Sequence, residues 1–321
     1  MKRETRDMTR VALVTGGTGF MGRRLLDELL RAGWSVHCLA LPGTEGDVAG
    51  LVRRGLRLHR VTETPAAWQA EGAALRPDVV FHLASRFVAE HVAGDVEPLV
   101  AGNVLFGCLL LDALTAAGCR RLVNIGTSWQ HYRDADYDPV CLYAATKQAF
   151  EDLAEYYVQA RGLDMVTLKL FDTYGPDDDR PKLVPALLGL CRDGGHADLS
   201  AGTQEIDLVY VDDVVAAIVT AGLRLLSHAD GSGPQRVPGR RECFAVATGE
   251  PVSLRELVAV IERLSQARLG VTWGARPGRA REVRRPWSRG ERLPGWEPSV
   301  SLEEGLRRCL RAAGCSADGG R

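Results

Sequence analysis

Residues 11–22 read VALVTGGTGFMG, a short apolar run followed by glycines at every third position. The apolar run, Val11–Thr15, predicts a buried strand, and the apolar spacing after the glycines predicts a helix. At such a junction Gly16 permits a tight turn, Gly19 lets the backbone approach a pyrophosphate, and Gly22 lets the helix pack closely on the strand. The amides at the start of the helix then face the phosphate. An ordinary glycine-rich turn is the alternative, but the strand–turn–helix context favours a dinucleotide-binding turn.

The rest of the first half repeats this alternation of strand and helix. Short apolar runs bounded by turn residues are separated by segments of about 10–20 residues with helical apolar spacing. The alternation is typical of parallel βαβ units, so we predict an α/β protein with a doubly wound parallel sheet, the Rossmann fold. The predicted strands are Val11–Thr15, Ser35–Leu41, Asp78–Leu83, Arg121–Gly126 and Met165–Leu170, and the predicted helices are Gly19–Ala32, Pro65–Leu75, Glu97–Ala117 and Leu142–Ala160.

After Tyr174 the alternation weakens, and Gly, Pro and Asp cluster in two stretches. We expect this half to form a smaller α/β C-terminal substrate lobe, with helices over Pro185–Arg192, Asp212–Leu226 and Leu254–Leu264. The predicted organisation is a flexible tail over 1–9, a dinucleotide-binding domain over 10–173, and a substrate-binding lobe over 174–207 and 229–321, with 208–228 packing back onto the sheet.

The composition excludes several classes of protein. The chain has 321 residues, a formal net charge of −1, 45% hydrophobic and 25% charged residues, which suits a globular enzyme and not a generally basic, nucleic-acid-coating surface. No stretch approaches about 18 uninterrupted apolar residues, so we expect no membrane-spanning helix. The first ten residues lack the apolar core of a secretory signal, and the eight cysteines show no metal-binding spacing. We therefore expect a cytoplasmic protein with reduced thiols that binds no metal, membrane or nucleic acid.

The residues after the second predicted strand bear on the choice of dinucleotide. NAD sites usually place Asp or Glu there to accept a hydrogen bond from the ribose 2′-hydroxyl, whereas NADP sites tend to place Arg nearby. This chain has HCLALPG over 37–43, and the nearest carboxylate, Glu45, is displaced. The missing acid favours NADP, while NAD stays possible. Arg23, Arg53 or Arg54 could neutralise the additional phosphate, or be ordinary surface arginines.

Tyr143 and Lys147 lie four residues apart at the start of a predicted helix, so both side chains fall on one face. A nearby ammonium favours phenolate, so we expect Lys147 to lower the pKa of Tyr143 and make it a usable acid or base near neutral pH. The chain keeps only four lysines beside 36 arginines, and Lys suits a ribose hydroxyl better than the forked Arg. Ser128 follows the fourth predicted strand, whose carboxyl end borders the ligand crevice in such sheets. Their combination predicts Ser128, Tyr143 and Lys147 as the catalytic set, although YxxxK alone could be incidental.

With these motifs the chain resembles the extended short-chain dehydrogenase/reductases, the NAD-dependent epimerase/dehydratase group that acts on nucleotide sugars. The resemblance covers residues 10–310. The segments that carry it are TGGTGFMG (15–22), DVVFHLA (78–84), NVLFG (103–107), LKLFDTYGP (168–176), DLVYVDD (207–213), CFAVATGEPVSLREL (243–257) and LPGWEPSVSLEEG (293–305). It implies the same triad, with Thr127 as the alternative hydroxyl. It implies these cofactor-binding residues: Gly16, Thr18, Gly19, Phe20, Met21, Gly22, Leu83, Ala84, Ser85, Tyr143 and Lys147.

The segment at Thr127 bears on the reaction. Dehydratases of this group add an acid and a base as a Thr-Asp-Glu run, whereas this chain has Thr127-Ser128-Trp129. A 4-epimerase or a 4-ketoreductase needs only Ser, Tyr, Lys and nicotinamide. The segments around Trp129, Tyr143 and Asp172 are most similar to CDP-abequose and paratose synthases and related 4-ketoreductases. The resemblance therefore implies NAD(P)H-dependent reduction of a nucleotide-linked 4-keto-6-deoxyhexose in deoxysugar biosynthesis.

The resemblance also implies a nucleotide-diphosphate sugar as substrate, although relatives that handle intact hexoses have Asn at Asp172 and Arg at Ile206. Seven arginines lie in 276–292 and could clamp a pyrophosphate or form a solvated basic face. We expect no metal at Asp177–Asp179 and a structural role for His82. His131, Trp129 and Tyr132 could line the sugar pocket or fill the core. The implied substrate-binding residues are Arg86, Thr127, Trp129, Asp172, Lys182, Arg276 and Arg279.

Two other functions stay open. A nucleotide-sugar 4-epimerase would hold NAD tightly and show no net redox change, and a non-catalytic sensor or scaffold would bind NAD(P) without turnover. Non-catalytic relatives generally lose the Tyr or the Lys, and both are present here. Many relatives dimerise through helices equivalent to Glu97–Ala117 and Leu142–Ala160, so the resemblance implies a homodimer.

Overall fold

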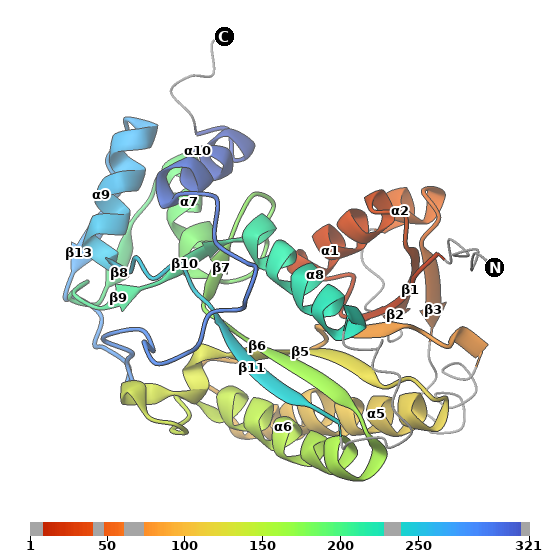
Figure 1. Ribbon diagram of the computed structural model, residues 1–321. Helices are drawn as coiled ribbons and strands as arrows, with labels where there is room; N and C mark the ends of the chain where they lie inside the picture. Colours follow the sequence, from red (N-terminus) through yellow and green to blue (C-terminus); the bar gives the residue numbers. More distant parts are fainter. Residues whose placement is uncertain (1–8, 41–47, 61–73, 228–238, 316–321) are drawn as a thin grey trace.

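A seven-stranded parallel sheet forms the centre of the computed structural model, which describes residues 9–40, 48–60, 74–227 and 239–315 (Figure 1). Its strand order is β11-β6-β5-β4-β1-β2-β3, and every neighbouring pair is parallel. The predicted doubly wound α/β fold is thus confirmed. The strands are β1 (Val11–Thr15), β2 (Ser35–Ala40), β3 (Arg57–Arg60), β4 (Val79–His82), β5 (Arg121–Thr127), β6 (Asp164–Leu170) and β11 (Arg241–Val246).

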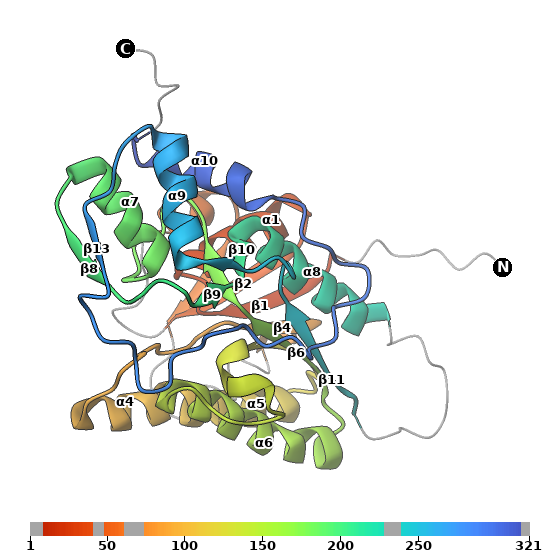
Figure 2. The ribbon, with the colours of Figure 1, turned by 90° about the vertical axis from the view of Figure 1, so that its left-hand side faces the viewer.

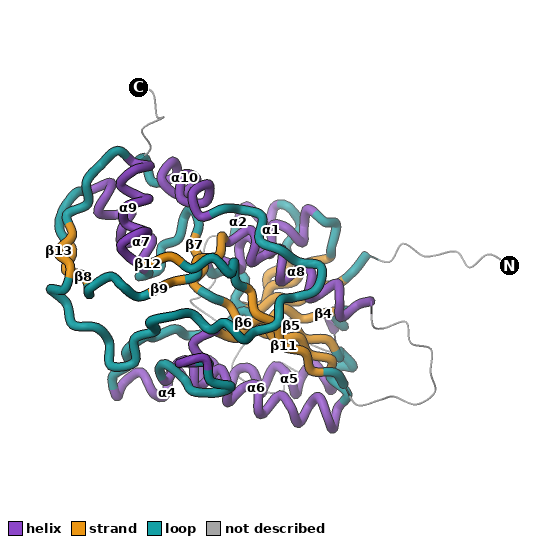
Figure 3. The backbone as a smooth tube through the Cα atoms, turned by 60° about the vertical axis from the view of Figure 1, so that its left-hand side comes forward, coloured by secondary structure: helices purple, strands orange, loops and turns teal. Residues whose placement is uncertain are grey.

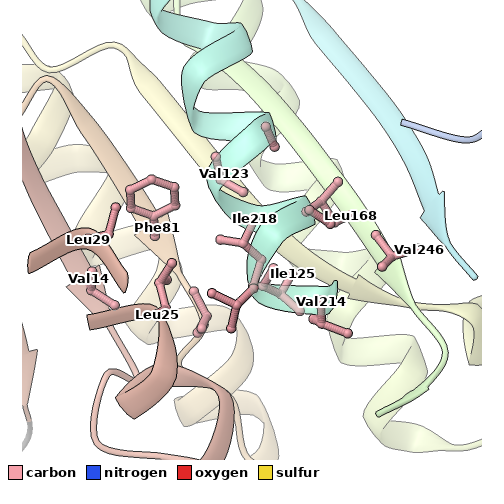
Figure 4. Close-up of a cluster of buried hydrophobic side chains, with 14 of the residues drawn as sticks. Val14, Leu25, Leu29, Phe81, Val123, Ile125, Leu168, Val214, Ile218 and Val246 are labelled. Atoms are coloured by element: carbon pink, nitrogen blue, oxygen red, sulfur yellow. The ribbon is translucent and has the colours of Figure 1, made fainter. Parts of the chain in front are cut away.

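Helices cover both faces of this sheet (Figures 1 and 2). On one face lie α1 (Phe20–Arg31) and α8 (Val211–Ser227), and on the other α5 (Phe106–Ala116) and α6 (Leu142–Arg161). Because the inner strands are covered twice, β4 is buried at all four residues, as parallel strands in this fold usually are. Figure 4 shows the core on the α1/α8 face, where Leu25, Phe81, Ile125 and Ile218 are among the buried side chains.

A long helical segment crosses the α6 side of the sheet. The predicted helix Glu97–Ala117 forms as α4 (Val96–Val100), a π-helical turn (Ala101–Leu105) and α5. By length and composition alone the helical stretch Ala93–Ala116 could cross a membrane, with a mean hydropathy of 1.9, whereas we expected no such helix. Core helices of soluble proteins pass the same test, and 44% of its most apolar window is buried against the rest of the protein.

The second half builds a smaller lobe beside the central sheet (Figure 3). Three helices surround its own apolar core, which includes Tyr174, Leu187, Leu257 and Leu306. The helices are α7 (Leu183–Asp193), α9 (Leu254–Ser265) and α10 (Leu302–Ala312). Short strands pair two by two: β7 (Asp172–Tyr174) with β10 (Leu208–Tyr210), β8 (Ala197–Leu199) with β13 (Val271–Trp273), and β9 (Glu205–Ile206) with β12 (Val252–Ser253).

The structure departs from the predicted division of the chain at β11. The sequence analysis assigns 229–321 to the lobe, yet Arg241–Val246 pairs with β6 along its whole length in the central sheet. This strand begins with Arg and Glu because it is a sheet edge, so its apolar run is too short to predict a strand. Helix α8 packs against α1 and the central strands. Most of the predicted helix Pro65–Leu75, and residues 1–8 of the predicted tail 1–9, lie outside the described residues.

Candidate active site

The glycine turn between β1 and α1 is built by close backbone contacts. Gly16 adopts φ +69°, and a Cβ there would lie 2.5 Å from the Ala84 nitrogen in the loop after β4. A Cβ on Gly22 would lie 2.1 Å from the Gly16 carbonyl oxygen, so only glycine lets α1 start this close to the turn. A Cβ on Gly19 would meet nothing nearer than 3.5 Å, because this residue faces the opening. The turn and the loop after β4 therefore form one cradle at the point where strand order reverses, which is where such sheets bind ligands.

A cavity of about 740 Å³ opens from this cradle. We call it the larger cavity, to distinguish it from a smaller one described below. It is lined by every residue that the sequence analysis assigns to the cofactor, and by Ser128. Because α1 points its first amides at this space and glycines keep it clear, the described residues fit a dinucleotide. Sequence reasoning missed several lining residues: Phe87, Pro98, Phe106, Phe171 and Arg180.

The predicted triad converges at this cavity from two elements. Tyr143 and Lys147 lie on the first turns of α6, and Ser128 begins a 3-10 turn directly after β5. Thr127 ends β5, and its hydroxyl oxygen accepts a hydrogen bond from the Trp129 nitrogen at 3.3 Å. The Thr127 nitrogen in turn donates to the buried Gln130 side chain at 3.0 Å, which fixes the strand end that carries Ser128.

The protonation of Tyr143 differs from the expectation. Burial raises the pKa of Tyr143 to about 12, and a hydrogen bond with Ser85 only partly offsets that effect. The sequence analysis expected Lys147 to lower this pKa, and that expectation is wrong because the pKa is raised. The groups whose charges act on the phenol are Cys141 and Arg180, and Lys147 is not among them. The phenol is therefore protonated at neutral pH.

Lys147 instead belongs to a group of buried ionisable side chains. Its side chain is 1% exposed, and burial lowers the pKa of Lys147 to about 8, with Glu151 raising and Lys169 lowering it further. His82 lies on the other side, where burial and then the Lys147 charge lower its pKa to about 3. Its Nδ1 atom is 2.7 Å from the Thr15 hydroxyl, and its ring stacks on Phe106, so His82 is a neutral structural residue of β4.

Asn103 ties the loop after β4 to α6. The π-helical turn places it inside, where its amide nitrogen donates to the Arg86 carbonyl and to the Thr146 hydroxyl, both at 2.9 Å. Its amide oxygen accepts from the Arg86 nitrogen at 2.7 Å and from the Ser85 hydroxyl at 3.1 Å. Asn103 thus holds Ser85, the hydrogen-bond partner of Tyr143, in place. The NVLFG segment alone did not predict this role.

A smaller cavity of about 290 Å³ continues from the first toward the lobe. Trp129, Asp172 and Lys182 line both cavities, as does Ser128. Arg276 and Arg279 line only the smaller cavity, and Arg86 and Thr127 line only the larger one. His131 and Tyr132 also line the smaller cavity, and the His131 ring stacks on Trp287 with centroids 3.9 Å apart. The predicted substrate residues therefore divide between two connected spaces.

Phe87 forms the wall where the cavities meet, and no motif marked it in the sequence. Its ring lies edge-on to Tyr143 with centroids 5.0 Å apart, and 5.8 Å from the Trp129 ring. The Lys182 ammonium sits 3.7 Å from the centre of the Phe87 ring. Burial lowers the pKa of Lys182 and raises that of Asp172, and each charge opposes the effect on the other. The one sequence signal that could have identified Phe87 is that this residue lies in the loop after β4.

Several of the remaining charged candidates form ion pairs, and others do not line the larger cavity. Arg276 and Arg279 each approach the Glu90 carboxylate at 3.8 Å. Asp178 pairs with Arg180 at 2.6 Å, and within the described parts of the chain no cluster of His, Cys, Asp or Glu could hold a metal ion. Neither Arg23, Arg53 nor Arg54 lines the larger cavity, and Arg54 pairs with Asp27. Glu45 and the residues that follow β2 lie outside the described residues.

Comparison with known proteins places the chain among enzymes that act on nucleotide sugars. The family model of the NAD dependent epimerase/dehydratase family matches residues 12–231. CDP-abequose synthase of Salmonella muenchen is 23% identical over 307 residues, covering 95% of this chain and 98% of that protein. UDP-glucose 4-epimerase of Mycolicibacterium smegmatis is 28% identical over 316 residues, covering 93% and 96%. The crystal structure of Thermus thermophilus UDP-glucose 4-epimerase in complex with NAD superposes with a TM-score of 0.77 at 27% identity, covering 94% and 98%.

Together the glycine cradle, the connected cavities and these matches identify the chain as a nucleotide-sugar-modifying member of the extended short-chain dehydrogenase/reductases, and it belongs to the NAD-dependent epimerase/dehydratase family.

Proposed function

We propose that this enzyme reduces the 4-keto group of a nucleotide-linked 4-keto-6-deoxyhexose with NAD(P)H. The observation that carries the proposal is the junction of the two cavities at Ser128. There the chain presents the Ser128 hydroxyl and an aromatic wall of Phe87 and Trp129, and Ser128-Trp129 stands where dehydratases carry the Asp-Glu of their Thr-Asp-Glu run. An aromatic wall suits the methyl group of a 6-deoxy sugar, because its rings offer apolar contact.

The proposed roles follow from the state of each side chain. Reduced nicotinamide, when bound, supplies a hydride to sugar C4. Ser128 and Tyr143 donate hydrogen bonds to the carbonyl oxygen and stabilise the negative charge that develops on it. Tyr143 then gives its proton to that oxygen, and its phenol is protonated at neutral pH before it does so. Lys147 holds the ribose hydroxyls, and the charge of Arg180 favours the phenolate that is left.

Reduction is the first candidate, and a 4-epimerase is the second, because UDP-glucose 4-epimerases are among the relatives. A ketoreductase only adds a hydride and a proton to the sugar, whereas a 4-epimerase first removes both and then returns them. An epimerase keeps NAD through purification, so denaturing the purified protein and assaying the released nucleotide separates the two candidates.

We further propose NADP as the cofactor. The proposal is supported by β2, which ends in His37-Cys-Leu-Ala40 without a carboxylate to accept from a ribose 2′-hydroxyl. Leu39 lines the larger cavity, and the Cys38 sulfur packs against Gly17. Comparing NADPH with NADH in the same assay tests this choice.

The decisive experiment is oxidation of NADPH, followed by its absorbance, with CDP- and dTDP-4-keto-6-deoxyglucose. We expect one NADPH consumed for each sugar reduced. Tyr143→Phe should lose at least about 100-fold in kcat, while Tyr156→Phe, an exposed tyrosine on the same helix, should change little. Unchanged turnover in Tyr143→Phe, or no oxidation with any keto-sugar nucleotide, would overturn the proposal.

We also propose that two chains associate through α4–α5 and α6, as the family resemblance implies. The proposal is supported by apolar side chains that these helices leave exposed. Val96, Val100 and Leu105 are 42%, 44% and 54% exposed, and Leu153 and Tyr156 are 47% and 55% exposed. Exposed apolar clusters of this kind are typical of interaction surfaces.

A further inference from the structure

Beneath the larger cavity lies a buried ion pair that the reaction described above does not use. The Lys169 ammonium, on β6, donates to both carboxylate oxygens of Glu151, on α6, at 2.7 and 2.9 Å. Both side chains are almost fully buried, at 2% and 1% exposure. Glu151 follows Lys147 by one helical turn, so the pair sits directly behind the lysine that lines the cavity.

The fold makes room for this pair at a glycine. A Cβ on Gly126 would lie 2.8 Å from Lys169 Cδ and 3.1 Å from both Glu151 Oε1 and Gln130 Oε1. The Gln130 amide nitrogen donates to Glu151 at 3.1 Å, while its oxygen accepts from the Thr127 nitrogen. The pair thus connects α6, β6 and the strand end that carries Ser128.

We propose that Glu151 is a positioning residue for Lys147: its buried carboxylate, held by Lys169, Arg241 and Gln130, places a negative charge one helical turn behind that lysine at the cofactor cavity. The inference rests on the role of Lys147 given under the proposed function. Lysine is rare in this chain, and three of its four lysines, Lys147, Lys169 and Lys182, lie at or directly behind the cavities.

The charges around Lys147 oppose each other. Burial lowers the pKa of Lys147 to about 8, while Glu151 favours its ammonium form and Lys169 disfavours it. His82, packed from β4, is neutral, and Tyr143 on the same helix face is a neutral phenol. Arg241 from β11 reaches the second Glu151 oxygen at 3.3 Å and pairs with Glu155 at 3.2 Å. Glu151 is thus the buried anion that favours the ammonium form of Lys147.

Two substitutions of this pair should move Lys147 in opposite directions. Glu151→Gln keeps the hydrogen bond from Gln130 but removes the anion, so the titration midpoint of Lys147 should fall by about one pH unit. Lys169→Met keeps the aliphatic chain over Gly126 but removes the competing cation, so the midpoint should rise by about one pH unit. A merely structural pair would lose stability in both variants without this opposition.

The measurement is a pH titration of protein labelled with ¹³C at the lysine ε-carbon. With four lysines the spectrum holds four signals, and the Lys147→Arg variant identifies the signal of Lys147. Lys169→Arg should leave the Lys147 midpoint within about half a pH unit of wild type, because it preserves the charge. Glu155→Gln is the matched control on the next turn of α6, an exposed carboxylate that also pairs with Arg241. It should leave Lys147 unchanged.

Shifts in the same direction, or no shift in either variant, overturn the inference. Should Glu151→Gln fail to fold, as judged by circular dichroism, equal Lys147 midpoints in Lys169→Met and Lys169→Arg overturn it instead. The titration needs no substrate, so it separates this inference from the proposed function. Opposed midpoints together with no turnover on any keto-sugar nucleotide refute only the reductase.

Discussion

His82 shows at the scale of one residue how this site restricts buried charge. Its ring is buried between Phe106 and Phe150 beside the Lys147 ammonium, and its pKa is lowered to about 3 from an ordinary value near 6.5. The unfolded chain therefore takes up a proton below pH 6.5 that the folded protein refuses until about pH 3. Linkage then requires the free energy of unfolding to decrease as the pH is lowered from about 6.5 to about 3, by up to about 1.4 kcal/mol for each pH unit.

Replacing His82 by Asn should remove this pH dependence. At pH 7 we expect the variant to be less stable than wild type, because the bond to Thr15 is altered. By pH 5 the stability gap should narrow by about 2 kcal/mol, since only wild type loses stability to this histidine. Urea unfolding at pH 7, 6 and 5 measures the gap. His196→Asn, which changes an exposed histidine, should show a nearly constant gap, and a constant gap in His82→Asn would contradict the assigned pKa.

At this scale the sequence predicted residue types better than their states. Ser128, Tyr143 and Lys147 were predictable because their spacing along one helix and one strand end is a local property. The raised pKa of Tyr143 was not, because it depends on burial by Phe87 and other residues distant in sequence. The ion pair of Glu151 with Lys169 was equally hidden, since it joins residues 18 positions apart on different elements.

Among the elements, the position of α1 depends on the absence of a Cβ atom at Gly22. The start of this helix fits against the glycine turn only because Gly22 has no side chain. Gly22→Ala should push α1 from the turn, cost about 2 kcal/mol or more in the free energy of unfolding, and weaken NADPH binding at least about tenfold. Thermal unfolding and titration of NADPH fluorescence measure the two effects.

A second helical glycine provides the matched control for α1. Gly189 lies inside α7, and a Cβ there would meet no atom within 4 Å. Gly189→Ala should therefore stabilise the protein by up to about 1 kcal/mol, through helix propensity alone, and leave NADPH binding unchanged. Equal losses of NADPH affinity in the two variants would show that the close contact at Gly22 is unimportant.

Sequence periodicity predicted the elements that bury a whole face and missed those that lie at edges. Helices α6 and α8 and strand β6 lie within a residue or two of their predicted bounds, because long apolar patterns determine them. Strand β3 has the sequence RLHR, and β11 begins with Arg-Glu, so neither carries a strong apolar signal. Their pairing partners, β2 and β6, supply the order that the local sequence lacks.

At the scale of the whole molecule, the arginine-rich stretch 276–292 is a strap between the two halves. It leaves β13, in the lobe, as a loop (Figure 3). Its residues Arg276, Arg279 and Arg281 line the smaller cavity. Arg281 pairs with Asp138, and Arg289 with Asp136. The Asp134 carboxylate accepts from the Ser288 nitrogen at 2.7 Å and from its hydroxyl at 2.9 Å. The sequence analysis offered two interpretations of this stretch, a clamp for pyrophosphate and a solvated basic face. Neither interpretation predicted its contacts with residues 134–138 of the first half of the chain.

Loosening the strap should affect the sugar nucleotide and spare the dinucleotide. Asp134→Asn keeps a side chain that tolerates the observed φ of +62°, but it removes the charge that strengthens both Ser288 bonds. We expect KM for the sugar nucleotide to rise about fivefold and KM for NADPH to stay unchanged. Asp193→Asn, which removes an exposed ion pair on α7, is the control. A rise in KM for NADPH instead would place the strap's effect in the larger cavity.

The exposed apolar side chains of α4–α5 and α6 make assembly the last testable property. If two chains pair through these helices, light scattering after size exclusion should give twice the 34.8 kDa of one chain. Leu105→Arg combined with Leu153→Arg places charges in the contact and should return the mass to that of a monomer, because an unpaired buried charge is costly. Leu223→Arg, at a 39% exposed leucine of α8, should leave the dimer intact. A double variant that stays dimeric, or a Leu223→Arg protein that dissociates, would place the interface elsewhere and leave these apolar helices without a partner surface.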